Sequence, residues 1–210
     1  SSGVLNSFNS VVSSTTLDMA SSTNAEVTSV KLWTMGYDTG DIDGDSSYTD
    51  SRNQVGDPLH SEPVVITYGG TDETPDSTIY FGTNEGFIHA VNTNSGTETF
   101  AFLPTELHKN QKIFYDNTVA AGDRPYGMDG PITSWMYDKN ENNLILDEDN
   151  NLETDEHVYL YAGMRRGGRN YYALNVTDRS DPELLFKIEG GQGDFAKLGQ
   201  TWSRMTVAKV

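Results

Sequence analysis

Residues 79–102 read IYFGTNEGFIHAVNTNSGTETFAF, and this stretch decides the fold because its pattern is repeated further along the chain. The related stretch, at residues 158–188, reads VYLYAGMRRGGRNYYALNVTDRSDPELLFKI. Both contain a strand that ends in Gly, a turn, a second strand with aromatic residues followed by Ala, a polar turn and a last strand with aromatic residues. A short apolar segment precedes each of them, HSEPVVITYGG at 60–70 and DGPITSWMYD at 129–138.

A unit of four short strands that recurs along a chain is the sequence signature of a β-propeller blade. The sequence therefore predicts an all-β fold, a partial β-propeller of two antiparallel four-stranded blades and the start of a third. The third unit opens with TWSRMTVAKV at residues 201–210. The predicted strands are Pro63–Tyr68, Ile79–Thr83, Phe87–Asn92 and Thr97–Leu103, then Pro131–Tyr137, Val158–Gly163, Asn170–Val176 and Leu184–Ile188.

The whole chain can be divided into three segments from its sequence. Residues 1–33 are interpreted as a helix, a linker and a first strand, residues 34–57 as an acidic loop that leads into the propeller, and residues 58–210 as the partial propeller. Apolar residues at 5, 8 and 12 have helical spacing and predict a short helix over 4–13. The polar residues 13–26 are typical of a linker, and Val27–Trp33 is the first strand candidate. A helical turn is expected at Thr105–Lys109.

Two blades and the start of a third cannot close a ring, since closed propellers have about 4–8 blades. We therefore expect an open arc with exposed strand edges. Such edges need a cover, which the N-terminal helix and linker, further blades or another chain would supply. The incomplete third repeat favours a fragment of a longer protein over a whole cytosolic or mature secreted chain.

Composition excludes several classes of function. The chain carries 31 acidic and 14 basic residues, a net charge of -17, and such a surface repels nucleic acid and anionic membranes while it attracts cations. The absence of cysteine rules out disulfides, a thiolate nucleophile and a Cys-based zinc site. No apolar run approaches the roughly 20 residues that cross a bilayer, and no signal-peptide pattern stands at the start.

The first acidic loop is GDIDGDSSYTD at residues 40–50. It places Asp41, Asp43 and Asp45 at alternate positions, as the start of an EF-hand loop does. Oxygen ligands of this kind select Ca²⁺ or Mg²⁺ over softer metals. The twelfth position of such a loop is Arg52, so we expect Asp50 to supply the closing carboxylate.

The second acidic loop spans Asp138 to Asp149 and fits an EF-hand register more closely. Its sixth position is Asn143, which tolerates the left-handed conformation that glycine usually adopts there. The ligands of this register are Asp138, Asn140, Asn142, the Leu144 carbonyl and Asp149. An alternative register uses Asp147, Asp149, Asn151, Glu153 and Asp155. We expect Ca²⁺ in at least one of the two loops, against the simpler interpretation of solvated acidic loops.

Enzyme motifs are missing from the chain. His60, which precedes Ser61, and His89 could join an acid, but no G-x-S-x-G elbow supports a catalytic triad, and a hydrogen bond within a blade is expected instead. Neither a phosphate-binding loop nor G-x-G-x-x-G occurs. The basic run 165–169, RRGGR, is interpreted as a Gly-Gly hairpin turn whose arginines pair with nearby acids.

The longer motifs resemble a known family. GDPLHSEPVVITYG at 56–69, the stretch at 79–102, YGMDGPIT at 126–133, VYLYAGMRRGGRNYYALNVTD at 158–178 and LGQTWS at 198–203 occur in order. Together they are similar to the C-terminal propeller region of the PilY/PilC-type proteins, which are type IV pilus biogenesis proteins and pilus-tip adhesins. The segment DGDSSYTDSRNQVGDPLHSEP at 43–63 resembles the start of that domain. The resemblance extends from about residue 38 to the C-terminus.

The resemblance implies a non-enzymatic assembly and adhesion module with a role in pilus extension and twitching motility. It implies secretion in a Gram-negative bacterium, to the periplasm, outer membrane, cell surface or pilus tip. Pilins or minor pilins, the rest of the same adhesin and a host or surface ligand are the implied partners, and Ca²⁺ is the implied ion. The alternative is a fragment of a quinone-dependent dehydrogenase of the PQQ type, which residues 80–100 also resemble.

Overall fold

The computed structural model describes residues 3–208 of the chain. It divides into two compact units, which are considered separately below. The sheet unit contains the chain up to residue 5, residues 58–102 and residues from 126 on, and the helical unit contains residues 6–57 and 103–125. Among the described residues, no helix combines the length and the apolar character that a membrane span requires.

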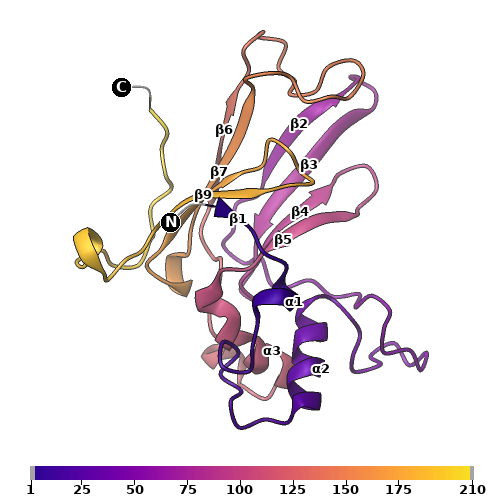
Figure 1. Cartoon of the computed structure of the whole chain (residues 1–210), viewed down its shortest axis with the longest axis vertical. Coiled ribbons are helices and arrows are strands. Elements are labelled where there is room, and N and C mark those ends of the chain that lie inside the picture. The colour runs from indigo at the N-terminus through magenta and orange to yellow at the C-terminus, as the bar shows by residue number, and fades with distance from the viewer. Residues whose placement is uncertain (1–2, 209–210) are drawn as a thin grey trace. The chain divides into compact units, whose positions relative to one another are not determined.

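Figure 1 shows the strands and helices of the chain in order. The strands of the sheet unit are β1 (Gly3–Val4), β2 (Val64–Gly70), β3 (Pro75–Gly82), β4 (Ile88–Asn92), β5 (Glu98–Phe102), β6 (Ile132–Tyr137), β7 (His157–Gly163), β8 (Tyr171–Asn175) and β9 (Glu183–Ile188). The same unit has the short 3₁₀ helices η3 (Arg165–Gly167) and η4 (Gly193–Phe195). The helical unit contains α1 (Phe8–Val11), α2 (Asn24–Thr34), η1 (Thr105–Asn110), α3 (Gln111–Asp116) and η2 (Ala121–Asp123).

The sheet unit confirms the two predicted blades. Blade one is the four-stranded sheet β2-β3-β4-β5, and blade two is the sheet β9-β8-β7-β6 with β1 added beside β9. All of the strand pairs are antiparallel. Both blades have a register shift between their third and fourth strands, after Ala90 in blade one and after Ala173 in blade two. The repeated sequence therefore folds into two sheets of the same construction.

Aromatic side chains join the two blades. The ring of Phe102 in blade one meets the ring of Tyr172 in blade two edge-on, with 5.6 Å between the centroids. The buried Tyr68 hydroxyl donates to the carbonyl oxygen of Val176 at 2.8 Å and lies 2.6 Å from the Tyr80 hydroxyl. Burial strongly raises the pKa of Tyr68, so this hydroxyl stays protonated and keeps its hydrogen bonds.

An arginine clamp strengthens the same junction. Arg179 follows β8, and its guanidinium makes two hydrogen bonds to the Asp76 carboxylate of blade one, at 2.8 and 2.5 Å. The guanidinium also lies over the Tyr68 ring, 4.3 Å from its centroid. The hydrogen bonds from Arg179 hold the pKa of Asp76 below its ordinary value, because they favour the charged carboxylate.

One strand edge has a cover that differs from the expected one. β1 pairs with the outer strand of blade two, where Gly3 faces Leu184 and Val4 faces Glu183. The N-terminal segment thus covers this edge with a short strand ahead of the helix, a cover that was not among the three expected ones. β5, the corresponding outer strand of blade one, pairs only with β4 among the described strands.

The helical unit corrects the interpretation of the first 34 residues. The strand predicted at Val27–Trp33 is wrong, because these residues lie in α2. Residues 13–26 are not a linker: Leu17 and Met19 are buried in a core with Val12 and Val30. The N-terminal helix is shorter than predicted, spanning Phe8–Val11 only. The expected helical turn near residue 105 is confirmed by η1.

Candidate metal centre

The first acidic loop, residues 38–50 of the helical unit, is closed at its base by backbone pairing. The amide of Asp38 donates to the Asp50 carbonyl at 3.0 Å, and the flanking Tyr37 and Ser51 form an antiparallel bridge. The Asp38 side chain is buried and accepts hydrogen bonds from the amides of Gly40, at 3.3 Å, and Ile42, at 2.8 Å. Asp38 therefore shapes the loop from within, a role that the sequence interpretation missed.

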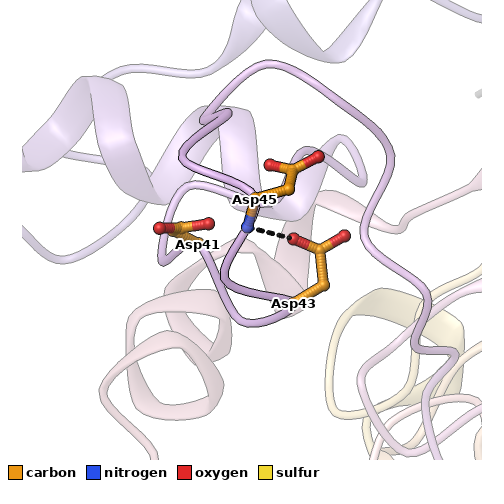
Figure 2. Close-up of side chains that lie close together, drawn as sticks. All are labelled: Asp41, Asp43 and Asp45. Atoms are coloured by element: carbon orange, nitrogen blue, oxygen red, sulfur yellow. Dashed lines mark hydrogen bonds between the residues drawn. The ribbon is translucent and has the colours of Figure 1, made fainter.

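Three carboxylates converge in this loop, and they are three of the four carboxylates predicted there. One oxygen from each of Asp41, Asp43 and Asp45 lies within 4.8 Å of the others, and the cluster is partly to fully exposed. Figure 2 shows the three side chains on one turn, with the bond from the Asp45 amide to the Asp43 carboxylate, 3.3 Å long. Gly44 has a φ of +77°, which lets the chain double back between the carboxylates.

The fourth predicted ligand of the first loop, Asp50, is not among the three carboxylates that converge. Its Oδ1 is buried without a hydrogen-bond partner in the described part of the chain. A buried carboxylate oxygen without a partner is costly unless a donor or a cation meets it. The donor set of this loop is all oxygen, which fits a hard cation such as Ca²⁺ or Mg²⁺.

The second acidic loop, residues 138–156 of the sheet unit, is organised by its first predicted ligand. The Asp138 carboxylate accepts the amide of Glu141 at 2.7 Å and that of Asn143 at 2.5 Å. Asn143 has a φ of +63°, as expected for the sixth position of the register. The Oδ1 atoms of Asn140 and Asn142 accept the amides two residues further on, at 3.0 and 2.7 Å. These hydrogen bonds hold the first half of the loop in a series of tight turns.

Glu153, and not the predicted Asp149, contacts the two asparagines of the loop. The side-chain amide of Asn140 donates to Glu153 Oε2 at 2.5 Å, and that of Asn142 donates to Glu153 Oε1 at 3.1 Å. Asp149 lies in a separate turn, where its amide donates to Asp147 Oδ1 at 2.9 Å. The structure therefore brings Asn140 and Asn142 together with Glu153, a residue that the sequence placed only in the alternative register.

The middle of the second loop is fixed to blade one. The amides of Ile145 and Leu146 both donate to the carbonyl of Tyr68, at 2.9 and 2.8 Å, and Ile145 is fully buried. Glu156 is also buried: its Oε1 accepts the Lys139 amide at 3.1 Å, and its Oε2 has no partner among the described residues. Order in this loop is thereby coupled to the junction between the blades.

The histidines and the basic turn have structural contacts. His60 Nδ1 lies 2.8 Å from the buried carboxylate of Asp129, which Arg165 also meets at 3.3 Å. His89 Nδ1 lies 2.5 Å from Glu98 on the neighbouring strand. His89 thus makes the hydrogen bond expected within a blade, whereas His60, which precedes β2, bonds to Asp129, which precedes β6, and so links the two blades. The Ser61 hydroxyl accepts the Gly82 amide at 2.7 Å.

The fold and the loops together define a class of protein. Two stacked antiparallel blades with the same register shift make a partial β-propeller, and acidic loops with convergent oxygen atoms lie in each unit. The chain belongs to the family described as the PilY1 beta-propeller domain, whose model matches residues 43–208.

The curated relatives agree with the family. The chain is 27% identical over 177 residues to the type IV pilus biogenesis factor PilY1 of Pseudomonas aeruginosa strain UCBPP-PA14, covering 74% of this chain and 14% of that protein. It is 29% identical over 133 residues to a PilY1 homologue of Xylella fastidiosa strain Temecula1, covering 63% and 9%. Among solved structures, the Pseudomonas aeruginosa PilY1 C-terminal domain matches with a TM-score of 0.40 and 26% identity, over 64% of this chain and 23% of that one. The chain thus spans only a small part of its curated relatives.

Proposed function

We propose that this chain is a non-enzymatic module of a type IV pilus biogenesis protein. Family membership over residues 43–208 carries this proposal, and the names of the curated relatives support it. The module would belong to a secreted protein at the outer membrane, cell surface or pilus tip of a Gram-negative bacterium. Its partners would be pilins or minor pilins, the rest of the same protein and, as an adhesin, a host or surface ligand.

The pilus role has a genetic test. Removal of residues 43–208 from the gene of the host bacterium should reduce surface pili and the diameter of twitching zones, and the parent gene should restore both. Sheared surface pilin measured by immunoblot gives the first readout. Normal piliation and motility after the removal would contradict the pilus role. Turnover of a redox dye after a quinone is added to the purified chain would instead favour the dehydrogenase alternative.

Calcium binding at the acidic loops is the second part of the proposal. In the first loop, the convergence of Asp41, Asp43 and Asp45 and the unpartnered oxygen of Asp50 support it. In the second loop, the supporting set is Asp138, Asn140, Asn142, the Leu144 carbonyl and Glu153 in place of Asp149. A bound cation would neutralise carboxylates that otherwise repel one another in a chain of net charge -17.

Calorimetry with matched variants tests both loops. We expect the parent chain to bind Ca²⁺, Asp43→Asn to remove the binding heat of the first loop, and Asp138→Asn to remove that of the second. Asp72→Asn, an exposed residue of the β2–β3 turn with the same charge change, should bind as the parent does. Absence of binding heat in the parent, or equal heat in all four proteins, would exclude metal binding at these loops. A Mg²⁺ titration separates the two hard cations, because Mg²⁺ demands a tighter octahedron.

A further inference from the structure

A cavity of about 440 Å³ opens between the two blades, among the turns at one end of the sheets. Its walls come from the start of β3, the β4–β5 hairpin, the β8–β9 turn and the second acidic loop. The segment that follows Thr201 crosses over Gly163 at the end of β7, which is the opposite end of these strands. The cavity is therefore walled by two blades that are both present in the chain, and the C-terminal segment does not start over it.

One side of the cavity is an ion pair that satisfies itself. The guanidinium of Arg179 donates to both oxygens of Asp76, and its Nη1 also donates to the Thr78 hydroxyl at 3.3 Å. A carboxylate or phosphate ligand would have to compete with Asp76 for this guanidinium. The pair therefore adds little net charge to the cavity and is a poor anchor for an anion.

Asp178 is a carboxylate of the cavity with binding capacity left. Its Oδ1 accepts the amide and the hydroxyl of Ser180, at 2.8 and 2.6 Å, and these bonds fix the side chain. Its Oδ2 accepts no hydrogen bond within the described part of the chain. The bonds from Ser180 hold the pKa of Asp178 below its ordinary value, so the carboxylate is charged at neutral pH. One fixed and one open oxygen make it an acceptor for a cationic donor.

The second acidic loop gives the cavity an apolar wall. Leu146 and Leu152 both line the cavity, and they face each other in an antiparallel bridge that fixes their positions. Leu146 is buried, whereas Leu152 is 43% exposed. An exposed leucine and an open carboxylate in one cavity fit a ligand that combines an alkyl chain with a positive charge.

The charge of the surrounding turns also selects a cation. Residues 71–76, 138–156 and 177–183 contain only two basic residues, Lys139 and Arg179, and each of these is paired with a carboxylate. A cleft lined by charge of one sign concentrates the field and attracts ligands of the opposite sign.

We propose that this cavity binds a lysine side chain that a partner protein presents. The alkyl stem packs on Leu146 and Leu152, and the ammonium donates to Asp178 Oδ2. An ammonium is a compact charge that needs one open oxygen, whereas a guanidinium prefers two, so the site favours lysine over arginine. The volume of the cavity is in the range that holds a ligand larger than one side chain, which favours a lysine within a peptide segment over a free amine.

Nuclear magnetic resonance of the isotope-labelled chain tests the proposal with a short peptide of Gly and Ser that carries one central lysine. Matched peptides carry acetylated lysine, norleucine or arginine at the centre, and butylamine supplies the stem and charge without a peptide. At physiological salt, which screens exposed charges, the lysine peptide should shift the amide signals of the cavity in a saturable way. These signals are those of Asn150, Leu152, Asp178 and Ser180. Arginine peptide and butylamine should bind more weakly, and the two uncharged peptides should not bind.

Variants of the chain locate the contacts. Asp178→Asn keeps an oxygen that accepts the Ser180 amide and removes the charge, so we expect the affinity for the lysine peptide to fall about fivefold. Leu152→Ala shortens the apolar wall and should weaken binding about threefold. Asp72→Asn, with the same charge change in the exposed β2–β3 turn, and Val65→Ala, at a side chain that is 57% exposed, should bind as the parent does.

Four results would overturn the proposal. The first is the absence of saturable shifts at the cavity with the lysine peptide. The second is equal binding of the acetylated or norleucine peptide, because the ammonium would then have no role. The third is butylamine or the arginine peptide binding as tightly as the lysine peptide. The fourth is an equal loss of affinity in Asp72→Asn and Asp178→Asn, which would indicate general attraction to an acidic surface.

Discussion

Gly82 and Gly163 end the second strand of each blade, and both lack a side chain because the backbone of the next segment crosses there. A Cβ on Gly82 would overlap the Met128 carbonyl, and one on Gly163 would lie 2.9 Å from the Thr201 carbonyl oxygen. The repeat motif therefore preserves glycine at this place for a steric reason. The crossing backbone is the start of the next blade, so a single residue governs how closely consecutive blades approach.

We expect Gly82→Ala to lower the free energy of unfolding by about 1–3 kcal/mol, because backbone must shift to make room for the methyl group. Urea unfolding followed by tryptophan fluorescence measures the change. Gly199→Ala is the control, since a Cβ there meets nothing within 4 Å and should leave stability almost unchanged. Equal stabilities of the two variants would contradict the steric explanation.

His108 makes the helical unit sensitive to acid. It is buried, its Nδ1 has no hydrogen-bond partner among the described residues, and burial lowers its pKa below the ordinary 6.5 because the cation is poorly solvated. As the pH falls, His108 is therefore protonated at a higher pH in the unfolded chain than in the folded chain. The stability that the helical unit has with His108 neutral is therefore fully present above pH 6.5. It is lost as the pH falls from 6.5 through the lower pKa that His108 has in the folded state.

Hydrogen exchange of α2 and α3 should therefore speed up, after correction for the intrinsic rate, when the pH falls from neutral to about 5.5. His108→Gln should weaken this pH dependence. His157→Gln, which changes a histidine of the sheet unit, should retain it. Identical pH dependence in the parent and in His108→Gln would show that another group is responsible.

At the scale of the element, α2 shows that helix-capping residues can outweigh the strand preference of the β-branched residues that follow them. Thr23 accepts the Glu26 amide at 3.3 Å and Glu26 accepts the Thr23 amide at 2.8 Å, which is a complete capping box. The four letters TNAE carry this signal in the sequence. The strand prediction gave more weight to the β-branched Val27, Thr28 and Val30, whose intrinsic preference is weak beside a fixed helix start.

Removal of the cap should destabilise the helical unit. We expect Thr23→Ala to lower its free energy of unfolding by about 1 kcal/mol, because the Glu26 amide loses its acceptor and the Glu26 carboxylate loses the hydroxyl donor. Thr28→Ala, in the exposed part of the same helix, should be neutral or slightly stabilising, since Ala has the higher helix propensity. Urea unfolding followed by circular dichroism at the helix band compares the two. A Thr23→Ala chain as stable as Thr28→Ala would argue against the box.

Across the whole molecule, the junction between the blades is the feature that makes two repeats one folding unit. Tyr68 reaches from β2 to the carbonyl of Val176, Arg179 returns to Asp76, and the second acidic loop binds the carbonyl of Tyr68. None of these contacts is local in sequence. The blades should therefore unfold together, and order in the second loop should reinforce their contact.

Tyr68→Phe tests this coupling. The change leaves the Val176 carbonyl and the Tyr80 hydroxyl without a buried partner, so we expect a loss of about 1–3 kcal/mol in the free energy of unfolding of the sheet unit. Tyr137→Phe, at an exposed tyrosine at the end of β6, is the matched control and should cost almost nothing. Urea titration of both variants gives the comparison, and a Tyr68→Phe chain with parental stability would contradict the role of this hydroxyl.

The sequence by itself determined the two blades, their strand order and the two acidic loops. Alternation along short strands and glycine-rich turns are local signals, and the repetition of the pattern removes the ambiguity that each strand has alone. The convergence of Asp41, Asp43 and Asp45 was likewise predictable, because alternate positions of one tight loop face the same point.

Only the tertiary structure decided the rest. It placed Glu153 beside Asn140 and Asn142, assigned Asp38 to the interior of its loop, and joined Ile145 to Tyr68. It also revealed that Leu17 and Met19 form a core and that aromatic rings of neighbouring strands pack against one another in blade two. The physical reason is the same in each case: these contacts join segments whose approach depends on how whole sheets and helices pack, and no local pattern of residues encodes that distance.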